Sequence, residues 1–539
     1  MINVQKIKNV GILGLVGLLL IVLFFSGTFK TQDGLPLHTI YRGNSIEPVS
    51  LDPHLSGSLN EANIQRDIFE GLTTKGPNGN IIPGVAKRWE VSEDQMKWTF
   101  FLRKDAKWSN GEPVVASNFV EGLKRAIDPK TGASFSFLLK PILNAEKILK
   151  GEEKDLSRLG VRAINDYVLE IELESPVYHL LNLLAHHTAY PFPYKVYEEH
   201  KSKWTNPHYI VCNGPYKLTE WIPQSHIKLT KNDEYWDKKS VRTPNIVYYP
   251  TEDSHSELKR FIAGEIHTTE TIPQDQIEWI EQNMKSNLRT SPYAGIVFYA
   301  FNMTIEPFKS NLKLRQALAL AIDRDLISSK IAKLGAKPAY SWIPKGMGTY
   351  KSQDVFFASM SQTEREEKAK ALFTEAGFSL ENPLKVEILL GSSHFEKNLA
   401  IAISGMWKKT LNIETALRDE DWKLYVASRA EKKFQIIHLN GSADFPIPSA
   451  FLEIFLSDHN AGGYVNVEFD HLVHTGISEA TLDEQNKLFA EAETTLLNDI
   501  PVIPLYYPTK KHLVNINIQG WVDNFIDVHP SKYLFIVGK

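Results

Sequence analysis

The chain has 539 residues, of which 43% are hydrophobic and 23% are charged, an ordinary composition for a globular protein. A chain of this length is too long for one hydrophobic core and suffices for two or three domains. Its formal net charge is −4, so the chain has no overall excess of positive charge and we expect no nucleic-acid partner.

The N-terminus carries the clearest targeting signal. Lys6 and Lys8 precede an uncharged run, from Asn9 to Phe29, that is rich in Leu, Ile, Val and Phe. Residues 1–30 therefore resemble either a signal peptide or a single membrane anchor, because about 20 apolar residues are needed to span a bilayer. No cleavage site stands out, and Ser26-Gly27-Thr28 is the nearest candidate. We expect a periplasmic or otherwise extracytoplasmic protein, held at the inner membrane if this segment is not cleaved.

Residues 71–115 consist of strand-like runs that are separated by turn residues. Trp98, Phe100 and Leu102 fall on one face of a strand because side chains alternate between the two faces. The run Ser109-Asn110-Gly111-Glu112-Pro113 supplies turn residues before the next element. The pattern alone predicts a core strand followed by a turn.

Cys212 is the only cysteine, so the chain cannot form an internal disulfide. No cysteine ends the apolar N-terminal run, where a lipid anchor would be attached. An exported chain without disulfides depends on core burial, which its size permits. Cys212 lies between a strand-like run and a turn, so we expect a small buried hydrophobe rather than a nucleophile.

Two helices are predicted from their N-terminal caps. Ser361 to Glu364 forms a capping box, and Gly377 ends the helix that it opens. Thr481 to Glu484 opens a second helix, which Pro501 ends. The strand-like runs near these helices are Leu384–Leu390 and Val502–Tyr507. Helices that alternate with strands favour α/β lobes.

No catalytic or metal-binding motif stands in the sequence: there is no Gly-x-Ser-x-Gly, no His-Glu-x-x-His, no P-loop and no Cys pair. His186 and His187 are adjacent, so they cannot both face one site on a regular strand or act as i,i+4 helix ligands. We expect them in a partly exposed loop before Pro191. We therefore predict no catalytic residue, no metal ligand and no cofactor.

The order of these motifs resembles that of the solute-binding proteins that deliver peptides to ABC importers, the oligopeptide and dipeptide-binding class. The resemblance covers practically everything after Thr39. The segments that carry it are Ser50-Leu51-Asp52-Pro53-His54, Arg66–Leu72, the block 71–115, Asn213-Gly214-Pro215-Tyr216, Ala317–Arg324, Pro338-Ala339-Tyr340, Ala400–Lys409 and Ile503–Tyr507.

The resemblance implies an α/β fold of the large, cluster C periplasmic-binding-protein type, in which two lobes face a ligand cleft. It also implies an additional subdomain in the N-terminal lobe. By this analogy lobe I combines 40–69, 193–294 and 512–539, the extra subdomain is 70–192, and lobe II is 295–511.

The family's function implies a monomer that captures a short peptide and docks onto the permease subunits of an ABC importer, without catalysis. A peptide backbone can pair with exposed strand edges while its side chains enter water-filled pockets, so many sequences are accepted. The alternatives are a binder of cell-wall (murein) peptides, a peptide receptor that does not transport, and, less favoured, a periplasmic hydrolase.

Asp444 is the implied anchor for the peptide's α-ammonium group, because a charge-assisted pair is strong and directional. It lies in the loop Asn440–Pro446, which matches the loop that carries this carboxylate in relatives. The chain departs at Gly441 and Ser442, where relatives often have an aromatic residue and a cysteine, so one pocket is expected to be larger. Without the resemblance, an Asp in such a loop would be interpreted as a turn cap.

The remaining implied ligand-binding residues are Trp422, Arg429, Leu59, Phe135 and His438. Trp422 and Arg429 are seven residues apart, which puts both on one face of a helix. The resemblance makes Trp422 a flat wall and Arg429 a partner for a carboxylate. A core Trp and a surface Arg are the alternative. His438 offers a pH-sensitive donor, with a satisfied core histidine as the alternative.

Overall fold

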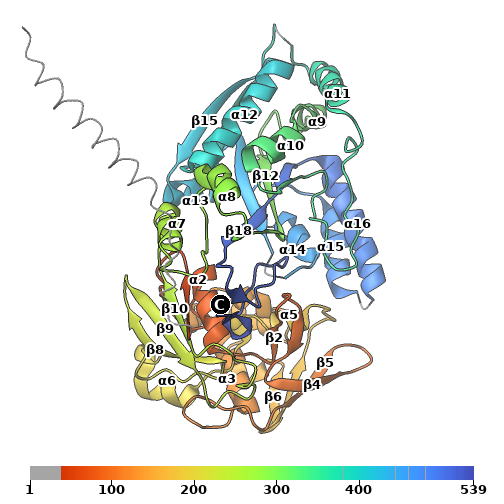
Figure 1. The fold of residues 1–539 in the computed structure, drawn as a ribbon. Coiled ribbons are helices and arrows are strands. Elements are labelled where there is room, and N and C mark those ends of the chain that lie inside the picture. The colour runs from red at the N-terminus through yellow and green to blue at the C-terminus, as the bar shows by residue number, and fades with distance from the viewer. Residues whose placement is uncertain (1–37, 380, 444, 459, 480, 539) are drawn as a thin grey trace, which may run out of the picture.

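The computed structural model describes residues 38–538, except 380, 444, 459 and 480. The predicted signal or anchor (1–30) and the predicted ligand anchor Asp444 lie outside the described residues. Two lobes stand one above the other in Figure 1, with the C-terminal end of the chain between them. In the part of the chain that the structure describes, no helix combines the length and apolarity needed to cross a bilayer.

The lower lobe contains a four-stranded sheet with the order β1-β10-β9-β8. β1 runs parallel to β10, whereas the other neighbours are antiparallel. The strands are β1 (Thr39–Gly43), β8 (Tyr216–Ile222), β9 (His226–Lys231) and β10 (Asn245–Tyr249). The helices of this part are α2 (Leu59–Ile68) and α6 (Tyr194–His200). α7 (Ser254–Ile262) and α8 (Ile277–Asn283) pack in a third, smaller hydrophobic cluster that includes Leu334 and Leu513.

A second sheet of the lower lobe is fully antiparallel and has the order β4-β5-β7-β6. Trp98, Phe100 and Leu102 of β5 are buried, whereas the residues between them are half-buried, so the predicted face of this strand is confirmed. The strands are β4 (Ala86–Val91), β5 (Lys97–Leu102), β6 (Val161–Asn165) and β7 (Val168–Glu172), with a hairpin of β2 (Thr73–Lys75) and β3 (Ile81–Pro83) nearby. The helices are α3 (Ala116–Ile127), α4 (Ala145–Leu149) and α5 (Leu180–Leu183).

The upper lobe is built on a mixed six-stranded sheet with the order β13-β17-β12-β16-β14-β15. Its strands are β12 (Gly295–Phe301), β13 (Lys337–Pro338), β14 (Lys385–Gly391), β15 (Glu414–Glu420), β16 (Ile436–Ser442) and β17 (Val502–Tyr507). Its helices are α9 (Leu312–Leu320), α10 (Arg324–Leu326), α11 (Gln362–Glu375), α12 (His394–Leu411), α13 (Trp422–Ala430), α14 (Ser449–Leu452), α15 (Val467–Ser478) and α16 (Leu482–Asp499).

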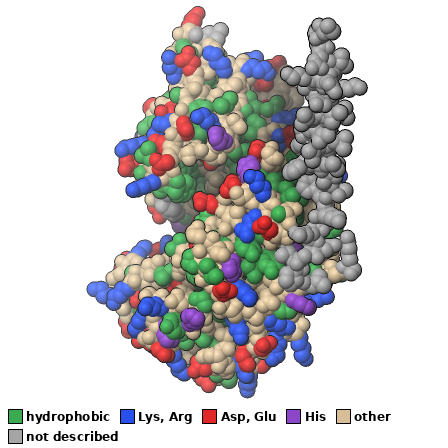
Figure 2. Space-filling view, turned by 60° about the vertical axis from the view of Figure 1, so that its left-hand side comes forward, with side chains coloured by type: hydrophobic (Ala, Val, Ile, Leu, Met, Phe, Trp, Pro, Cys, Tyr) green, Lys and Arg blue, Asp and Glu red, His purple; other side chains and the backbone are tan. Residues whose placement is uncertain are grey.

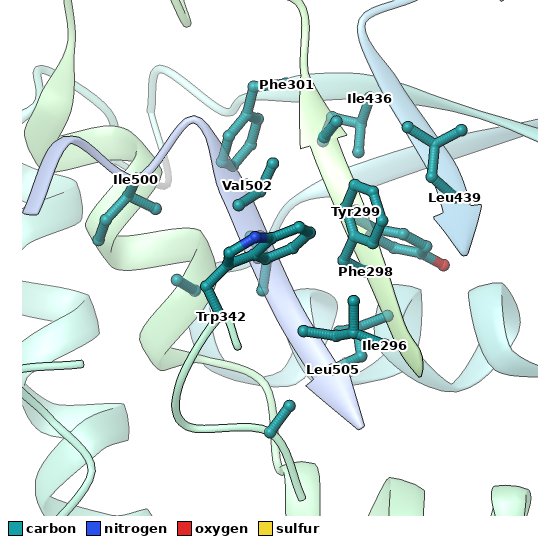
Figure 3. Close-up of a cluster of buried hydrophobic side chains, with 14 of the residues drawn as sticks. Ile296, Phe298, Tyr299, Phe301, Trp342, Ile436, Leu439, Ile500, Val502 and Leu505 are labelled. Atoms are coloured by element: carbon teal, nitrogen blue, oxygen red, sulfur yellow. The ribbon is translucent and has the colours of Figure 1, made fainter. Parts of the chain in front are cut away.

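β12 is the centre of the upper core, and all seven of its residues are buried. It pairs antiparallel with β16 on one side and with β17 on the other, so its backbone groups are satisfied within the sheet. Figure 3 shows Phe298 of this strand beside Trp342, and their ring centroids are 4.8 Å apart. The indole Nε1 of Trp342 donates to the carbonyl oxygen of Phe451 at 2.6 Å. The large ring is therefore buried without an unpaired donor.

The local predictions for this lobe are confirmed. α11 begins after Ser361, whose hydroxyl accepts from Glu364 N–H in a capping box. α16 begins after Thr481, which accepts from Glu484 N–H in the same way. Cys212, in the lower lobe, is fully buried, and burial raises the pKa of its thiol to about 12, so it is no nucleophile at neutral pH.

Two strands connect the lobes. β11 (Leu288–Pro292) leads from the lower lobe into β12, and β18 (Thr509–Leu513) leads back from β17. They pair antiparallel over their whole length, from Leu288 opposite Leu513 to Pro292 opposite Thr509. The large hydrophobic clusters lie on either side of this ribbon, one formed by residues from 294 to 506 and the other mainly by residues from 40 to 248. A two-stranded connection of this kind is the element about which two lobes can rotate.

Candidate functional site

A hollow separates the two lobes on the left side of the space-filling view in Figure 2. In the lower lobe the segment from Asp52 to Ser58 is fixed by one buried carboxylate. Asp52 accepts from Arg125 at both oxygens, at 2.9 and 2.8 Å, and from the indole Nε1 of Trp204 at 3.0 Å. Burial by itself raises the pKa of Asp52, but the Arg125 hydrogen bond and the charges of His54 and Arg125 outweigh it and lower that pKa. Asp52 is therefore ionised at neutral pH.

This fixed segment supports a pair of histidines. His187 Nδ1 lies 2.6 Å from the carbonyl oxygen of Pro53, and the ring of His186 is 4.0 Å from that of His187. Both imidazoles contact the edge or face of Phe135, with centroid distances of 5.1 Å to His186 and 5.4 Å to His187. Burial lowers the pKa of His187 to about 4 and that of His186 well below its usual value, so both rings are neutral at pH 7.

His186 and His187 both face Phe135, an arrangement that their adjacency excluded only for a regular strand or helix. His186 is the N-terminal cap of a short 3-10 helix, where it accepts from Thr188 N–H, and His187 is the first residue of that helix. This irregular backbone turns both rings toward Phe135, which a regular strand or helix would not do. His187 is also buried, not partly exposed.

Phe445 of the upper lobe reaches His186 of this pair and also His179. Its ring centroid lies 6.1 Å from that of His186 and 6.3 Å from that of His179, and the ammonium of Lys75 lies 5.8 Å from it. Phe445 directly follows Asp444 in the sequence. Phe445 therefore meets the lower lobe at His186, whose ring also contacts Phe135.

Leu59 lies at the start of a helix in the lower lobe. It is the first residue of α2 and its side chain is 40% exposed. The turn before it is held by Glu61, which accepts from Gly57 N–H at 2.9 Å, while Ser134 donates its hydroxyl to the Leu55 carbonyl at 3.1 Å. The structure thus joins the segment that leads to Leu59 to the segment that contains Phe135.

Trp422, Arg429 and His438 form a separate group in the upper lobe. Trp422 begins α13, is 71% exposed and stacks on Tyr425 at 5.8 Å. The hydroxyl of Tyr425 donates to the His438 carbonyl at 2.5 Å. Burial raises the pKa of Tyr425 to about 12, and the charge of nearby Arg429 offsets part of that rise. Trp422 is therefore not a core residue, and its large exposed ring is available to a ligand.

His438 is buried on β16 and faces Glu396, with 3.4 Å between its Nδ1 and the carboxylate oxygen. This contact is that of a core histidine. Its Nε2 and the hydroxyl of Tyr299 have no hydrogen-bond partner among the described residues. A direct contact of His438 with ligand stays a prediction.

Sequence reasoning did not select Phe445, His179 or His186 as site residues. Phe445 adjoins Asp444, and this adjacency was the available signal. The two histidines come from a part of the chain more than 250 residues away from that loop, and no local pattern reports such a contact.

Comparison with known proteins places the chain in a described family. The family model named "Bacterial extracellular solute-binding proteins, family 5 Middle" matches residues 80–463. The chain is 34% identical over 503 residues to the periplasmic oligopeptide-binding protein OppA of Salmonella typhimurium, covering 92% of this chain and 91% of the relative. It is 33% identical over 496 residues to the periplasmic murein peptide-binding protein MppA of Escherichia coli, covering 91% and 92%.

A solved structure gives the same result. The unliganded open form of the periplasmic murein tripeptide-binding protein MppA matches with a TM-score of 0.82 at 32% identity, over 94% of this chain and 98% of that one. The predicted two-lobed α/β fold and the predicted family resemblance are confirmed.

We predict that Asp52→Asn destabilises the protein by about 3–5 kcal/mol, because it leaves the Arg125 guanidinium buried without its counter-charge. The pKa of Asp52 is lower in the folded protein than in the unfolded chain. The ionised carboxylate therefore stabilises the folded protein at pH values above the pKa of the unfolded chain, and this stabilisation is lost as the pH falls through the pKa of the folded protein. Urea unfolding between neutral and acidic pH should therefore show a smaller loss of stability on acidification in the variant. The exposed pair Glu278–Lys333 offers the control Glu278→Gln, which should change stability little. Equal effects of the two changes would contradict the role given to Asp52.

Proposed function

Since this chain belongs to the bacterial extracellular solute-binding proteins of family 5, we propose that it captures short peptides between its lobes and delivers them to the permease of an ABC importer. The observation that carries this proposal is the match, over nine-tenths of both chains, to a protein named as a periplasmic oligopeptide-binding protein. The hollow between the lobes and the two-stranded connection support it. In this role the protein is a monomer outside the cytoplasm and performs no catalysis.

Binding in this proposal is a rotation of one lobe toward the other about β11 and β18. A ligand that contacts both lobes stabilises the closed form and so shifts the population toward it. The similarity to an unliganded open form supports an open starting state. In this arrangement lobe I consists of 40–69, 193–294 and 512–539, the extra subdomain of 70–192, and lobe II of 295–511. The separation of the two large hydrophobic clusters supports the division between the two lobes.

Asp444 is proposed to pair with the α-ammonium of the peptide. The contact of the neighbouring Phe445 with His179 and His186 supports a position for this loop at the junction of the lobes. A charged pair that is closed off from water by both lobes would fix the register of the peptide without regard to its sequence.

The space around the loop supports a roomy first pocket. Gly441 is the penultimate residue of β16, and a Cβ added to it would meet Ile296 and Phe298 atoms at 3.8 Å, an ordinary contact distance. The strand could therefore carry a methyl group at this position without a clash. This space is proposed to accommodate a bulky side chain of the ligand.

Trp422 and Arg429 are proposed to act farther along the peptide. The exposed ring of Trp422 offers a flat apolar surface, and Arg429 on the same helix offers a charge for a carboxylate. Leu59 and Phe135 would complete the opposite wall from the lower lobe. His438 would act indirectly, because its carbonyl holds Tyr425, which supports the Trp422 ring.

A murein peptide is the second candidate ligand. The similarity to MppA, at 33% identity over nine-tenths of both chains, is the observation that favours it. Both candidates are peptides with a free ammonium or carboxylate group, so the same anchors serve either one. Mass spectrometry of ligand retained by the protein after purification without denaturation separates them.

We predict that a mixture of unrelated short peptides raises the melting temperature, whereas free amino acids and sugars do not. The reason is backbone-directed recognition, and ligand at 100 times its dissociation constant stabilises the native state by about 2.7 kcal/mol. Differential scanning calorimetry with each class of ligand measures the effect. Stabilisation by a sugar alone, or cleavage of the bound peptide over hours, would contradict the proposal and favour another binder or a hydrolase.

The substitution Asp444→Asn tests the ammonium anchor. It keeps the shape of the side chain but leaves the ligand's charge unpaired, which should cost roughly 2–5 kcal/mol in peptide binding while the melting temperature of the free protein stays the same. Calorimetric titration with one peptide and with its N-acetylated form measures the coupling. The acetylated peptide should bind the wild type poorly and lose much less on mutation. Equal losses for both peptides would mean that Asp444 only shapes its turn.

The proposed location has its own test at the N-terminus. Retention of residues 1–30 would hold the protein at the inner membrane, and we expect the uncleaved chain, since no cleavage site stands out. The intact mass of protein extracted from its native envelope should then correspond to the full chain. A chain that begins near residue 30 would show that the segment is only a signal peptide.

A further inference from the structure

A buried cluster of His512, Asp527 and His529 lies where the strand β18 enters the lower lobe. The Nε2 atom of His512 is 2.8 Å from Asp527 Oδ1, and the Nε2 atom of His529 is 3.1 Å from the same oxygen. The potential ligand atoms of the three residues all lie within 4.8 Å of one another. Nothing in the proposed peptide site uses this cluster.

The tautomer of His512 follows from its second nitrogen. Nδ1 lies 2.9 Å from the carbonyl oxygen of Thr269, an acceptor, so Nδ1 carries a hydrogen. A neutral His512 then points the lone pair of Nε2 at the carboxylate of Asp527. Two lone pairs 2.8 Å apart repel each other, so this contact requires a cation between them or a proton on Nε2.

The supports of the cluster are those typical of metal ligands. A metal-bound histidine usually donates its other N–H to a backbone carbonyl, as His512 does to Thr269. Trp521 stacks on the His529 ring at 3.8 Å and fixes its plane. The Asn524 side chain stabilises the turn before His529 with two hydrogen bonds. Its amide group donates to the Val528 carbonyl at 2.9 Å, and its amide oxygen accepts from Val528 N–H at 3.1 Å. His512 is thus oriented by a hydrogen bond and His529 by ring stacking, while Nδ1 of His529 has no hydrogen-bond partner among the described residues.

Charged side chains of both signs surround the cluster, and they permit it to bind one divalent ion. Lys510 lies 3.5 Å from Asp527 Oδ2 and so leaves Oδ1 for the histidines. Arg42 donates to the His529 carbonyl at 2.9 Å, and the half-buried Glu270 lies within electrostatic range of His512 and Lys510. Asp67 also lies within electrostatic range of Arg42, so carboxylates accompany both cations near the cluster.

We propose that His512, Asp527 and His529 bind a divalent transition-metal ion of the Zn²⁺ type. Two imidazole nitrogens and one carboxylate oxygen are a donor set that Zn²⁺ uses at about 2.0–2.2 Å, with a fourth position left for water. Donors around such an ion are slightly more than 3 Å apart, close to the distances of 2.8 and 3.1 Å from the two histidines to the carboxylate oxygen. The two imidazole nitrogens lie within 4.8 Å of each other and would move together onto the ion. The competing occupant is a proton on His512.

The ion would act on the connection between the lobes. His512 belongs to β18, whereas Asp527 and His529 belong to the C-terminal segment, which also binds the link before β12 through Ala294 N–H to Phe525 O at 2.8 Å. A metal ion bound by His512, Asp527 and His529 would fasten β18 to the C-terminal segment and so to the lower lobe. The site is thus a clip at one end of the hinge and is distinct from the ligand cleft.

The test uses the purified protein without a polyhistidine tag, stripped of metal by a chelator. Calorimetric titration with Zn²⁺ should show one ion bound per chain, and Co²⁺ should give the visible absorption of a four-coordinate nitrogen and oxygen site. Zn²⁺ should raise the melting temperature in the absence of peptide. His512→Gln and His529→Gln should each weaken Zn²⁺ binding at least tenfold.

Two further variants serve as controls for the measurement of Zn²⁺ binding. His255 is an exposed histidine that contacts Asp253 and Asp275, so His255→Gln is the matched control and should bind Zn²⁺ as the wild type does. Lys510→Met keeps all three ligands and removes a nearby positive charge, so it should tighten binding several-fold. Absence of one-to-one Zn²⁺ binding in the wild type and in Lys510→Met would overturn the proposal and leave the cluster a protonated ion pair. Binding that survives both His512→Gln and His529→Gln would also overturn it.

Discussion

The antiparallel pairing of β11 with β18 is the constraint on which the rest of the structure depends. Each strand carries the chain from one hydrophobic core to the other, and the ladder between them keeps the two crossings side by side. Rotation about this ribbon changes the distance between the lobes while each core stays packed, because close-packed interiors resist deformation and short connecting strands do not. The ligand site, the hydrophobic cores and the buried His512 cluster are all placed relative to this ribbon.

The two walls of the proposed site are built by different physical means. In the lower lobe an ion pair between Asp52 and Arg125 fixes a loop. The Pro53 carbonyl of that loop contacts His187, whose ring in turn contacts Phe135. In the upper lobe a helix presents Trp422 to solvent over a buried Tyr425. A rigid polar scaffold on one side and an exposed aromatic surface on the other suit a binding site that must fix the ends of its ligand and tolerate variation between them.

Much of this molecule followed from local patterns. The alternation of Trp98, Phe100 and Leu102 located β5 and its buried face, because the side-chain period of a strand is two. Ser361 and Thr481 located the starts of α11 and α16, since an oxygen three residues before a free N–H can cap it. The ordered motifs also identified the family, which the comparisons confirm. The site residues Asp444, Trp422, Arg429, Leu59, Phe135 and His438 came from that resemblance and remain predictions.

The sequence by itself determined the secondary structure of the best-marked elements, the burial of Cys212 and membership of a family. Tertiary structure alone decided which distant side chains meet. Phe445 reaches His186 across the two lobes, and His512 meets Asp527 and His529 because β18 ends beside the C-terminal segment. The adjacent His186 and His187 share the Phe135 ring only because their backbone is irregular. Periodicity describes neighbours along a regular element, whereas these contacts depend on how separate elements pack, and no spacing in the chain records that packing.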